Sequence, residues 1–296
     1  MVKFWLAVVL SGVALAATGC TVNLSGEGVL VREERRFTVS GAPELALNTF
    51  DGSVQVRSWD RNEILVAVEK RASTEEEAMA LEIKATQDGN RITIEAPRPR
   101  GDGPVFGYST AVSFIVSVPR KLTLRVETGD GSIAADDLDG RIELRTGDGS
   151  VAADRITGEL HVSTGDGSVR AMDLNGRVDL SSGDGSITAR GRFQGLRAGS
   201  GDGSLTIEAD PGSTMDADWE ATTGDGSITF RVPGGFNAEV DADSSDGSVS
   251  VDGSGTSARA EGGRNEDRQT LQTRLGTGGR TIRLRSGDGS IRLTSR

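Results

Sequence analysis

The sequence has very few of the residues on which most enzymes and disulfide-stapled domains depend. Its 296 residues include one cysteine, one histidine and one tyrosine, and aromatic residues make up only 4%. A lone cysteine cannot form a disulfide within the chain. A lone histidine leaves little from which to assemble a nucleophile with a base partner. With so few large side chains, any core must be thin.

Basic residues are also fewer than acidic ones. The chain has 33 lysines and arginines against 44 acidic residues, which gives a net charge of −11. The phosphates of nucleic acids would repel such a chain, so nucleic acid is excluded as a partner. At this length, one or two domains are expected.

The N-terminus reads as a bacterial export signal. Lys3 supplies the positive start, Phe4 to Ala17 is apolar, and small residues follow directly before Cys20. This arrangement resembles the lipobox of bacterial lipoproteins, which implies that residues 1–19 are a lipoprotein signal peptide and that Cys20 is lipidated. An ordinary signal peptide or a short membrane anchor with an incidental cysteine is the alternative. Because Thr21 replaces the aspartate that retains enteric-type lipoproteins at the inner membrane, the outer membrane is favoured.

Glycine is abundant, with 41 residues, and much of it lies in one repeated pentapeptide. Thr-Gly-Asp-Gly-Ser starts at Thr128, and its aspartate returns every 18 residues from Asp130 to Asp202, with Ser in place of Thr in the later copies. A fixed period of this length is typical of stacked repeats.

Two stretches of each repeat alternate apolar and polar residues, which indicates two strands. In the first repeat they contain Ile133 and Ala135, then Ile142 and Leu144. Corners such as Leu138-Asp139-Gly140 separate them, since glycine allows the positive φ that corners need. Asp-Gly is also a hairpin signal, but residue type recurs at nearly every position under the 18-residue shift. The sequence therefore predicts an all-β fold, a parallel β-solenoid (β-helix) with about 18 to 23 residues per coil.

The regular coils are expected to follow a less uniform start. We expect a tether over residues 20–41, an irregular β part over residues 42–126 and the regular solenoid over residues 127–296. Within the irregular part, Ser73-Thr74 followed by glutamates is a capping signature and predicts one short helix that ends near Leu81.

The repeat loosens toward the C-terminus. After Asp202 the turn aspartates spread to spacings of 23 and 21 residues, while Ile228 and Val249 keep the apolar position. The core is therefore expected to continue while the corners grow. Residues 253–270 are polar and charged, and we predict a mobile loop there.

The column of turn aspartates is the most regular feature of the sequence. It comprises Asp130, Asp148, Asp166, Asp184, Asp202, Asp225, Asp246 and Asp288. Stacked carboxylates repel one another, so something must solvate, bond or neutralise them. We expect an architectural role in which each aspartate accepts hydrogen bonds from its own turn. Calcium bridging between coils is the alternative, although calcium takes six to eight oxygens and only one carboxylate per coil recurs; no cofactor is predicted.

No catalytic residue is predicted. His161 falls on the outward side of the second strand and is interpreted as a solvated surface residue. In other repeats its place is taken by Glu143, Asp179 and Arg197. An enzyme that cleaves glycans in a groove at the enlarged corners, 210–223, is the alternative. The large side chains near irregular loops are Trp59, Trp219 and Phe236. They are interpreted as corner packing rather than a ligand platform.

The order of features resembles a known bacterial family, the “putative adhesins”, a domain-of-unknown-function family of envelope β-solenoids. The resemblance rests on the Gly-Asp-Gly-Ser-Ile rungs, Ser58-Trp59-Asp60, the helix near Glu75, Val118-Pro119 and Gly278-Gly279. It covers nearly all of the mature chain. It implies a solenoid on the cell envelope with no established enzyme activity and no catalytic residue to carry over.

The sequence thus predicts a non-enzymatic, lipid-anchored envelope protein whose polar faces form a scaffold or an adhesin-like binding surface. The membrane is reached through the N-terminal lipid, and an envelope protein or a glycan is the expected ligand. A regulatory or envelope-stress lipoprotein that binds a membrane partner is the first alternative. A calcium-stabilised or end-to-end polymerising solenoid is the second.

Overall fold

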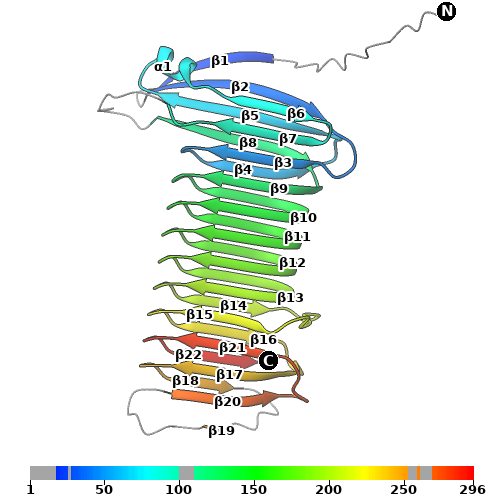
Figure 1. The fold of residues 1–296 in the computed structure, drawn as a ribbon, viewed down its shortest axis with the longest axis vertical. Helices are drawn as coiled ribbons and strands as arrows, with labels where there is room; N and C mark the ends of the chain where they lie inside the picture. The colour runs from blue at the N-terminus through cyan, green and yellow to red at the C-terminus, as the bar shows by residue number, and fades with distance from the viewer. Residues whose placement is uncertain (1–17, 26–27, 100–109, 253–258, 261–268) are drawn as a thin grey trace, which may run out of the picture.

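The computed structural model describes residues 18–25, 28–99, 110–252, 259–260 and 269–296. In this part of the chain, coils of β-strand stack into a long rod with one short helix at its N-terminal end (Figure 1). No helix among these residues is long and apolar enough to cross a membrane. The fold is the predicted β-solenoid.

The rod has two broad faces, each a stack of hydrogen-bonded strands. The first face begins, in stacking order, with β5 (Glu63–Ala72), β8 (Ala111–Pro119) and β4 (Val54–Trp59). It continues through the first halves of four long strands, β10 (Ile133–Thr146), β11 (Val151–Thr164), β12 (Val169–Ser182) and β13 (Ile187–Ser200). It ends with β14 (Leu205–Ala209), β16 (Ile228–Val232), β22 (Ile291–Ser295) and β18 (Val249–Asp252). The second face contains β6 (Lys84–Asp88), β7 (Arg91–Ala96), β3 (Glu44–Thr49), β9 (Lys121–Thr128), the second halves of β10 to β13, β15 (Trp219–Thr223), β21 (Thr281–Ser286), β17 (Ala238–Ser244), β20 (Gln269–Leu275) and β19 (Arg259–Ala260).

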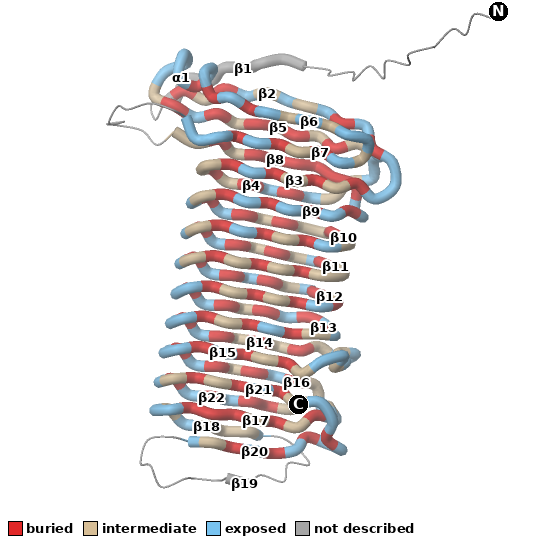
Figure 2. Tube along the Cα trace, viewed as in Figure 1, coloured by how far each residue is buried: buried red, intermediate tan, exposed pale blue. Residues whose placement is uncertain are grey.

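Apolar side chains form continuous columns between these faces. In the first face the column runs through Ile133, Val151, Val169, Ile187, Leu205, Ile228 and Ile291, each paired in register with the next. All seven are at most 1% exposed. The alternation of buried and exposed residues along each strand is visible as banding in Figure 2. Parallel stacking of equivalent positions confirms the solenoid and rules out separate hairpins.

The corner between the two faces is a bend within one paired strand. Hydrogen-bonded pairing between β10 and β11 continues through Leu138, Asp139 and Gly140. The bend lies at Asp137, which has φ of 57°. Aspartate is among the few residue types other than glycine that tolerate this left-handed conformation. Leu138 turns inward at the bend and is fully buried, so it fills the corner of the core.

The coils at the two ends of the rod are not stacked in chain order. The C-terminal strands β21 and β22 lie between the coil of β15 and β16 and the coil of β17 and β18 (Figure 1). At the other end, β3 and β4 lie between the coil of β7 and β8 and the coil of β9 and β10. The expected succession of coils therefore holds only in the middle of the rod.

The N-terminal end of the rod is closed by antiparallel strands and the helix. β2 (Gly28–Thr38) pairs along β5, and β1 (Thr18–Ser25) pairs with β2. α1 (Glu75–Ala80) is capped as predicted, because the Thr74 hydroxyl accepts a hydrogen bond from the Glu77 amide at 3.2 Å. Ala78 of the helix packs in a small cluster with β2 and β5.

Two predictions about the less regular segments need revision. Residues 20–25 and 28–38 of the expected tether form parts of β1 and β2. In β2, Val29, Val31 and Phe37 fall on one side of the strand and are buried. The predicted mobile loop, 253–270, lies mostly outside the described residues. Its described parts belong to β19 and β20, which pair antiparallel.

Candidate functional site

The turn aspartates lie along one narrow edge of the rod, where each coil passes from the second face to the first. Asp130, Asp148, Asp166, Asp184, Asp202, Asp225, Asp246 and Asp288 are all exposed. Their order in the stack follows the strands, so Asp288 stands between Asp225 and Asp246. Among the described residues these carboxylates accept no hydrogen bond and form no ion pair with the protein.

A second column, of buried Thr and Ser residues, makes the turn contacts expected of the aspartates. Thr146 Oγ1 donates to the Gly131 carbonyl of the preceding coil at 2.8 Å and accepts from the Gly149 amide at 3.3 Å. Ser182 repeats the pattern with Gly167 and Gly185, both at 2.9 Å. Because these hydroxyls are buried, they can satisfy backbone groups that water cannot reach. The prediction that the aspartates fill this role was therefore wrong.

Cation binding finds little support at this edge. No group of three or more His, Cys, Asp or Glu side chains in the described part of the chain could hold a metal ion. Each coil presents one turn carboxylate, whereas calcium needs six to eight oxygens. The aspartate column is better explained as an acidic, solvated edge.

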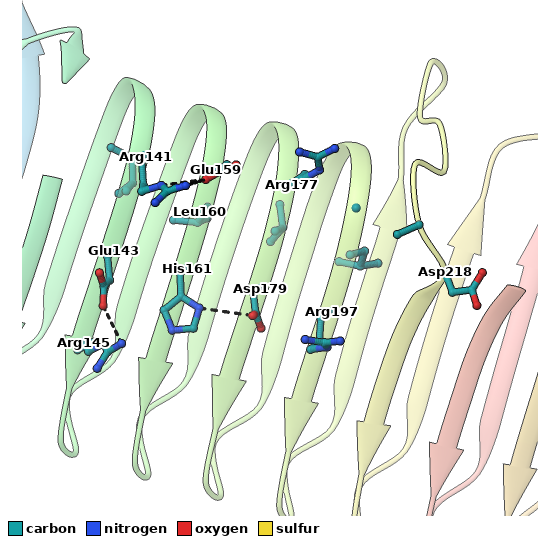
Figure 3. A pocket seen from close by; sticks show the side chains of 15 residues that line it. Arg141, Glu143, Arg145, Glu159, Leu160, His161, Arg177, Asp179, Arg197 and Asp218 are labelled. Atoms are coloured by element: carbon teal, nitrogen blue, oxygen red, sulfur yellow. Dashed lines mark hydrogen bonds and ion pairs between the residues drawn. The ribbon is translucent and has the colours of Figure 1, made fainter. Parts of the chain in front are cut away.

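A shallow groove on the second face brings charged residues together. It encloses about 520 Å³ over the second halves of β10 to β13 (Figure 3). Its charged lining residues are Arg141, Glu143, Arg145, Glu159, His161, Arg177, Asp179, Arg197 and Asp218. The inward-facing Ile142, Leu160, Val178 and Leu196 lie beneath them. The side chains in the groove therefore stand on a rigid, hydrogen-bonded sheet.

The charges of this face alternate in sign along the rod. One outward column runs, in register, through Arg125, Glu143, His161, Asp179, Arg197, Glu220, Arg283 and Asp241. Every second member is an acid, and His161 stands where the pattern has a cation. Opposite charges on neighbouring strands attract one another, which stabilises the stack. We call this set the charge ladder.

Ion pairs hold the charged side chains of the groove in place. Arg141 Nη2 lies 2.7 Å from Glu159 Oε2, and Arg145 Nη2 lies 2.7 Å from Glu143 Oε1 (Figure 3). His161 Nδ1 lies 3.6 Å from Asp179 Oδ2. The arginines remain largely accessible, with 71% of the Arg141 side chain exposed. They can therefore exchange an internal partner for an external one at low cost.

A missing side chain opens the C-terminal end of the groove. Gly195 pairs in register with Arg177, so the row of Arg141, Glu159 and Arg177 stops there. A Cβ atom at Gly195 would lie 3.3 Å from Arg177 Cγ. Beside Gly195, Arg177 Nη2 lies 3.0 Å from Asp216 Oδ2.

The groove holds no triad of the serine- or cysteine-hydrolase kind. Its lining contains no serine, threonine, cysteine or lysine. His161 and Asp179 therefore have no hydroxyl, thiol or amine in the lining to activate. The acids of the enlarged corner, proposed as the alternative catalytic region, are engaged by arginines in the pairs Asp210–Arg190, Asp216–Arg177 and Asp218–Arg283. The Asp210 hydrogen bond and charge raise the pKa of Arg190.

The large aromatic residues pack as predicted. Trp219 is fully buried, and its ring stacks on Phe236 at 5.2 Å between centroids. It also meets Phe193 edge to face at 6.1 Å. The Trp59 ring is held by a hydrogen bond from Nε1 to the Glu63 carbonyl at 2.8 Å. Trp219 and Phe236 therefore fill an irregular coil, and the half-buried Trp59 ring has the Arg61 guanidinium 4.9 Å from its centroid.

Sequence reasoning treated the outward residues of these strands as an ordinary solvated surface and missed the groove. The signal was present in the repeat alignment, because one outward position changes sign from coil to coil. Gly195 was the second signal, as it is the one glycine in a row otherwise occupied by Arg141, Glu159 and Arg177. Cys20 lies in β1, and nothing in the structure tests its lipidation.

Several solved structures of bacterial proteins match the chain. A “putative cell adhesion protein” of Clostridium sporogenes is 14% identical, with 90% of this chain and 99% of that chain covered and a TM-score of 0.32. A “putative adhesin” of Bacteroides fragilis is 14% identical, with 90% and 97% covered and a TM-score of 0.43. A “putative lipid binding protein” of Parabacteroides distasonis is 12% identical, with 88% and 96% covered and a TM-score of 0.47.

No curated protein matches the chain. The family described as Toastrack DUF4097 matches residues 43–294. This range includes the interleaved coils at both ends and all the strands that carry the charge ladder. The chain belongs to the Toastrack DUF4097 family.

Proposed function

We propose that the protein is a non-enzymatic binding scaffold of the bacterial cell envelope and that the groove over β10 to β13 is its ligand surface. The observation that carries this proposal is the charge ladder together with the neighbouring row of Arg141, Glu159 and Arg177, where ion-paired but accessible arginines stand on a rigid sheet. Such a surface is organised before the ligand arrives, so little side-chain entropy is lost on binding.

The chemistry of the groove favours a protein ligand. Arginine is enriched at protein interfaces and at their energetic hot spots, and four arginines line the groove. Its lining contains no tryptophan, tyrosine or phenylalanine ring on which a neutral sugar could stack. The alternating signs suit a partner surface with matching acids and bases, since electrostatic complementarity fixes register and partner choice. We therefore assign an envelope protein, rather than a glycan, as the ligand.

The cellular location of the protein is a further part of this proposal. The export signal and Cys20 support a lipid anchor, and Thr21 favours the outer membrane. Cys20 lies in β1, at the same end of the rod as α1 (Figure 1). Anchoring there would leave the charge ladder several coils away from the membrane. Mass spectrometry of the mature N-terminus and release of a Cys20→Ser variant from membranes test the anchor separately from the groove.

The groove itself is tested by crosslinking in native membranes followed by affinity purification. The double variant Arg177→Gln and Arg197→Gln should lose the crosslinked partner, because both arginines lie in the groove. Arg57→Gln with Arg170→Gln is the matched control, since both are exposed on the first face outside the groove. Equal capture by the two double variants would contradict the proposal.

The same experiment separates the remaining alternatives. Recovery of one integral membrane protein by the wild type, with an altered stress response on deletion, assigns a regulatory role. Loss of cell attachment on deletion assigns the adhesin role. Filaments in electron micrographs of the purified protein would instead show polymerisation, and dependence of its unfolding midpoint on calcium would revive the calcium alternative.

A further inference from the structure

A second depression lies on the first face, near the C-terminal end of the rod. It encloses about 330 Å³ and is lined by Thr229, Arg231, Asp252, Arg292, Thr294, Ser295 and Arg296. These residues come mainly from β16, β22 and β18, which are neighbours in the stack. It is therefore separate from the groove, which lies on the second face.

This pocket gathers arginines that lack acidic partners. Arg292 and Arg296 form no ion pair with any described residue. Arg231 has only Glu208, at 4.0 Å, and Glu208 also lies 3.9 Å from Arg190. Asp252 is the single acid in the lining and carries no ion pair to these arginines within the described residues. Arginines without an ion pair occur elsewhere among the described residues, such as Arg57 and Arg170, but here two of them line one pocket beside the weakly paired Arg231.

An unsatisfied hydroxyl points to the same place. Thr294 is only 9% exposed, and its Oγ1 has no hydrogen-bond partner. In register it stands between Arg231 on one strand and Asp252 on the other, and it lines the pocket. Buried polar groups are nearly always hydrogen-bonded in folded proteins. The buried Ser286 of the neighbouring coil segment follows that rule, because its hydroxyl donates to the Gly226 carbonyl at 2.9 Å.

We propose that this pocket binds a phosphate group carried on a small organic molecule. The guanidinium groups of Arg231 and Arg292 offer the planar donor pairs that match phosphate oxygens. The Thr294 Oγ1 atom is closed to water in the free protein, so its side chain must rotate for the hydroxyl to supply a further donor and gain the partner that it lacks. Asp252 lies at the edge, where it can accept a hydrogen bond from a hydroxyl of the attached group.

The size of the pocket sets the class of ligand. Ligand pockets in proteins typically have volumes of about 300 to 1,000 Å³, and the 330 Å³ here is larger than one phosphate needs. The phosphate is therefore attached to a group of about the size of glycerol or a single sugar. A phospholipid headgroup and a soluble phosphorylated compound share this chemistry, so the experiment must tell them apart.

The test uses the whole mature chain and three probes. Inorganic phosphate, glycerol 1-phosphate, and phosphatidylcholine vesicles that contain one fifth phosphatidylglycerol are each titrated, with binding followed by calorimetry. We expect saturable binding of glycerol 1-phosphate, at least tenfold tighter than that of inorganic phosphate. Vesicle binding of the same strength assigns a lipid headgroup, and its absence assigns a soluble ligand.

Variants tie the binding to the proposed atoms. Arg292→Gln should weaken glycerol 1-phosphate binding at least tenfold, whereas Arg170→Gln, an unpaired arginine on the same face outside the pocket, should leave it unchanged. Thr294→Val should weaken binding at least threefold yet raise the unfolding temperature of the free protein, because the orphan hydroxyl is gone. Absence of saturable binding, or equal effects of Arg292→Gln and Arg170→Gln, would overturn the proposal.

Discussion

Ile228 of β16 lies beside Ile291 of β22, near the end of the chain, and not beside Val249, which follows it in sequence. Ile291 in turn pairs with Val249. The coil of β21 and β22 therefore lies between two coils that precede it in the chain. If the coils stacked in chain order, the coil of β21 and β22 would have only one of the preceding coils as a neighbour. It has two, so its removal should destabilise both of them.

Truncation after Gly279 tests this interleaving. Removing β21 and β22 takes away the strands on which both β15 and β17 pair. We expect amide exchange protection to be lost from β15 to β20 and retained in β10 to β12, because stability in repeat folds is set by nearest neighbours. Deletion of residues 18–27 is the control, because it removes β1 from the other end of the rod. It should leave amide exchange protection in the solenoid unchanged. Retained protection in β17 after truncation would show that the coils can restack in chain order.

Glycine in the turn is required by the closeness of the stacked backbones. A Cβ atom at Gly149 would lie 2.1 Å from the Gly131 carbonyl oxygen, and the backbone cannot move without opening the stack. We expect Gly149→Ala to destabilise the protein by on the order of 3 kcal/mol in urea unfolding. Gly199→Ala is the control, because its Cβ would meet nothing closer than 3.9 Å. Equal midpoints for the two variants would mean that the turn tolerates a side chain.

The buried Thr and Ser hydroxyls of the turns should contribute more to the free energy of unfolding than the exposed serine hydroxyls of the same turns. Ser182→Ala leaves the Gly167 carbonyl and the Gly185 amide without their partner. The expected loss is about 1 to 3 kcal/mol, the typical penalty for an unsatisfied buried group. Ser186→Ala, at an exposed position of the same turn, should change the unfolding free energy by less than about 0.5 kcal/mol. A smaller effect for Ser182 than for Ser186 would contradict this assignment of roles.

The sequence predicted what repeats locally and missed what depends on distant neighbours. The columns through Ile133, the helix cap at Thr74 and the burial of Trp219 follow from period, capping chemistry and size. The neighbour of Ile228 could not be predicted in this way, because Val249 and Ile291 both offer a β-branched apolar side chain after the same Asp-Gly-Ser turn. Pairing of Ile228 with Val249 or with Ile291 would form equivalent backbone hydrogen bonds. The choice between them therefore depends on contacts made by the rest of the chain.

The candidate sites illustrate the same limit. The alternating charges of the charge ladder can be read from the sequence once the repeats are aligned, so the charge ladder could have been predicted. The pocket at Arg292 could not, since Arg231, Thr294 and Asp252 come from three segments whose stacking order is not sequential. Free arginines and an orphan hydroxyl are properties of the assembled face and have no local sequence signal.

His161 provides a direct test of the charge ladder. It stands between Glu143 and Asp179, where the alternation has a cation, and 41% of its side chain is exposed. A permanent positive charge should strengthen both neighbouring contacts, so we expect His161→Arg to stabilise the fold by about 0.5 kcal/mol at pH 8 and low salt. His161→Glu would place three acids in a row and should destabilise it by a similar amount. Both effects should shrink in 1 M salt, because screening weakens exposed pairs. If the two variants unfold at the same urea concentration at low salt, the alternation contributes nothing to stability.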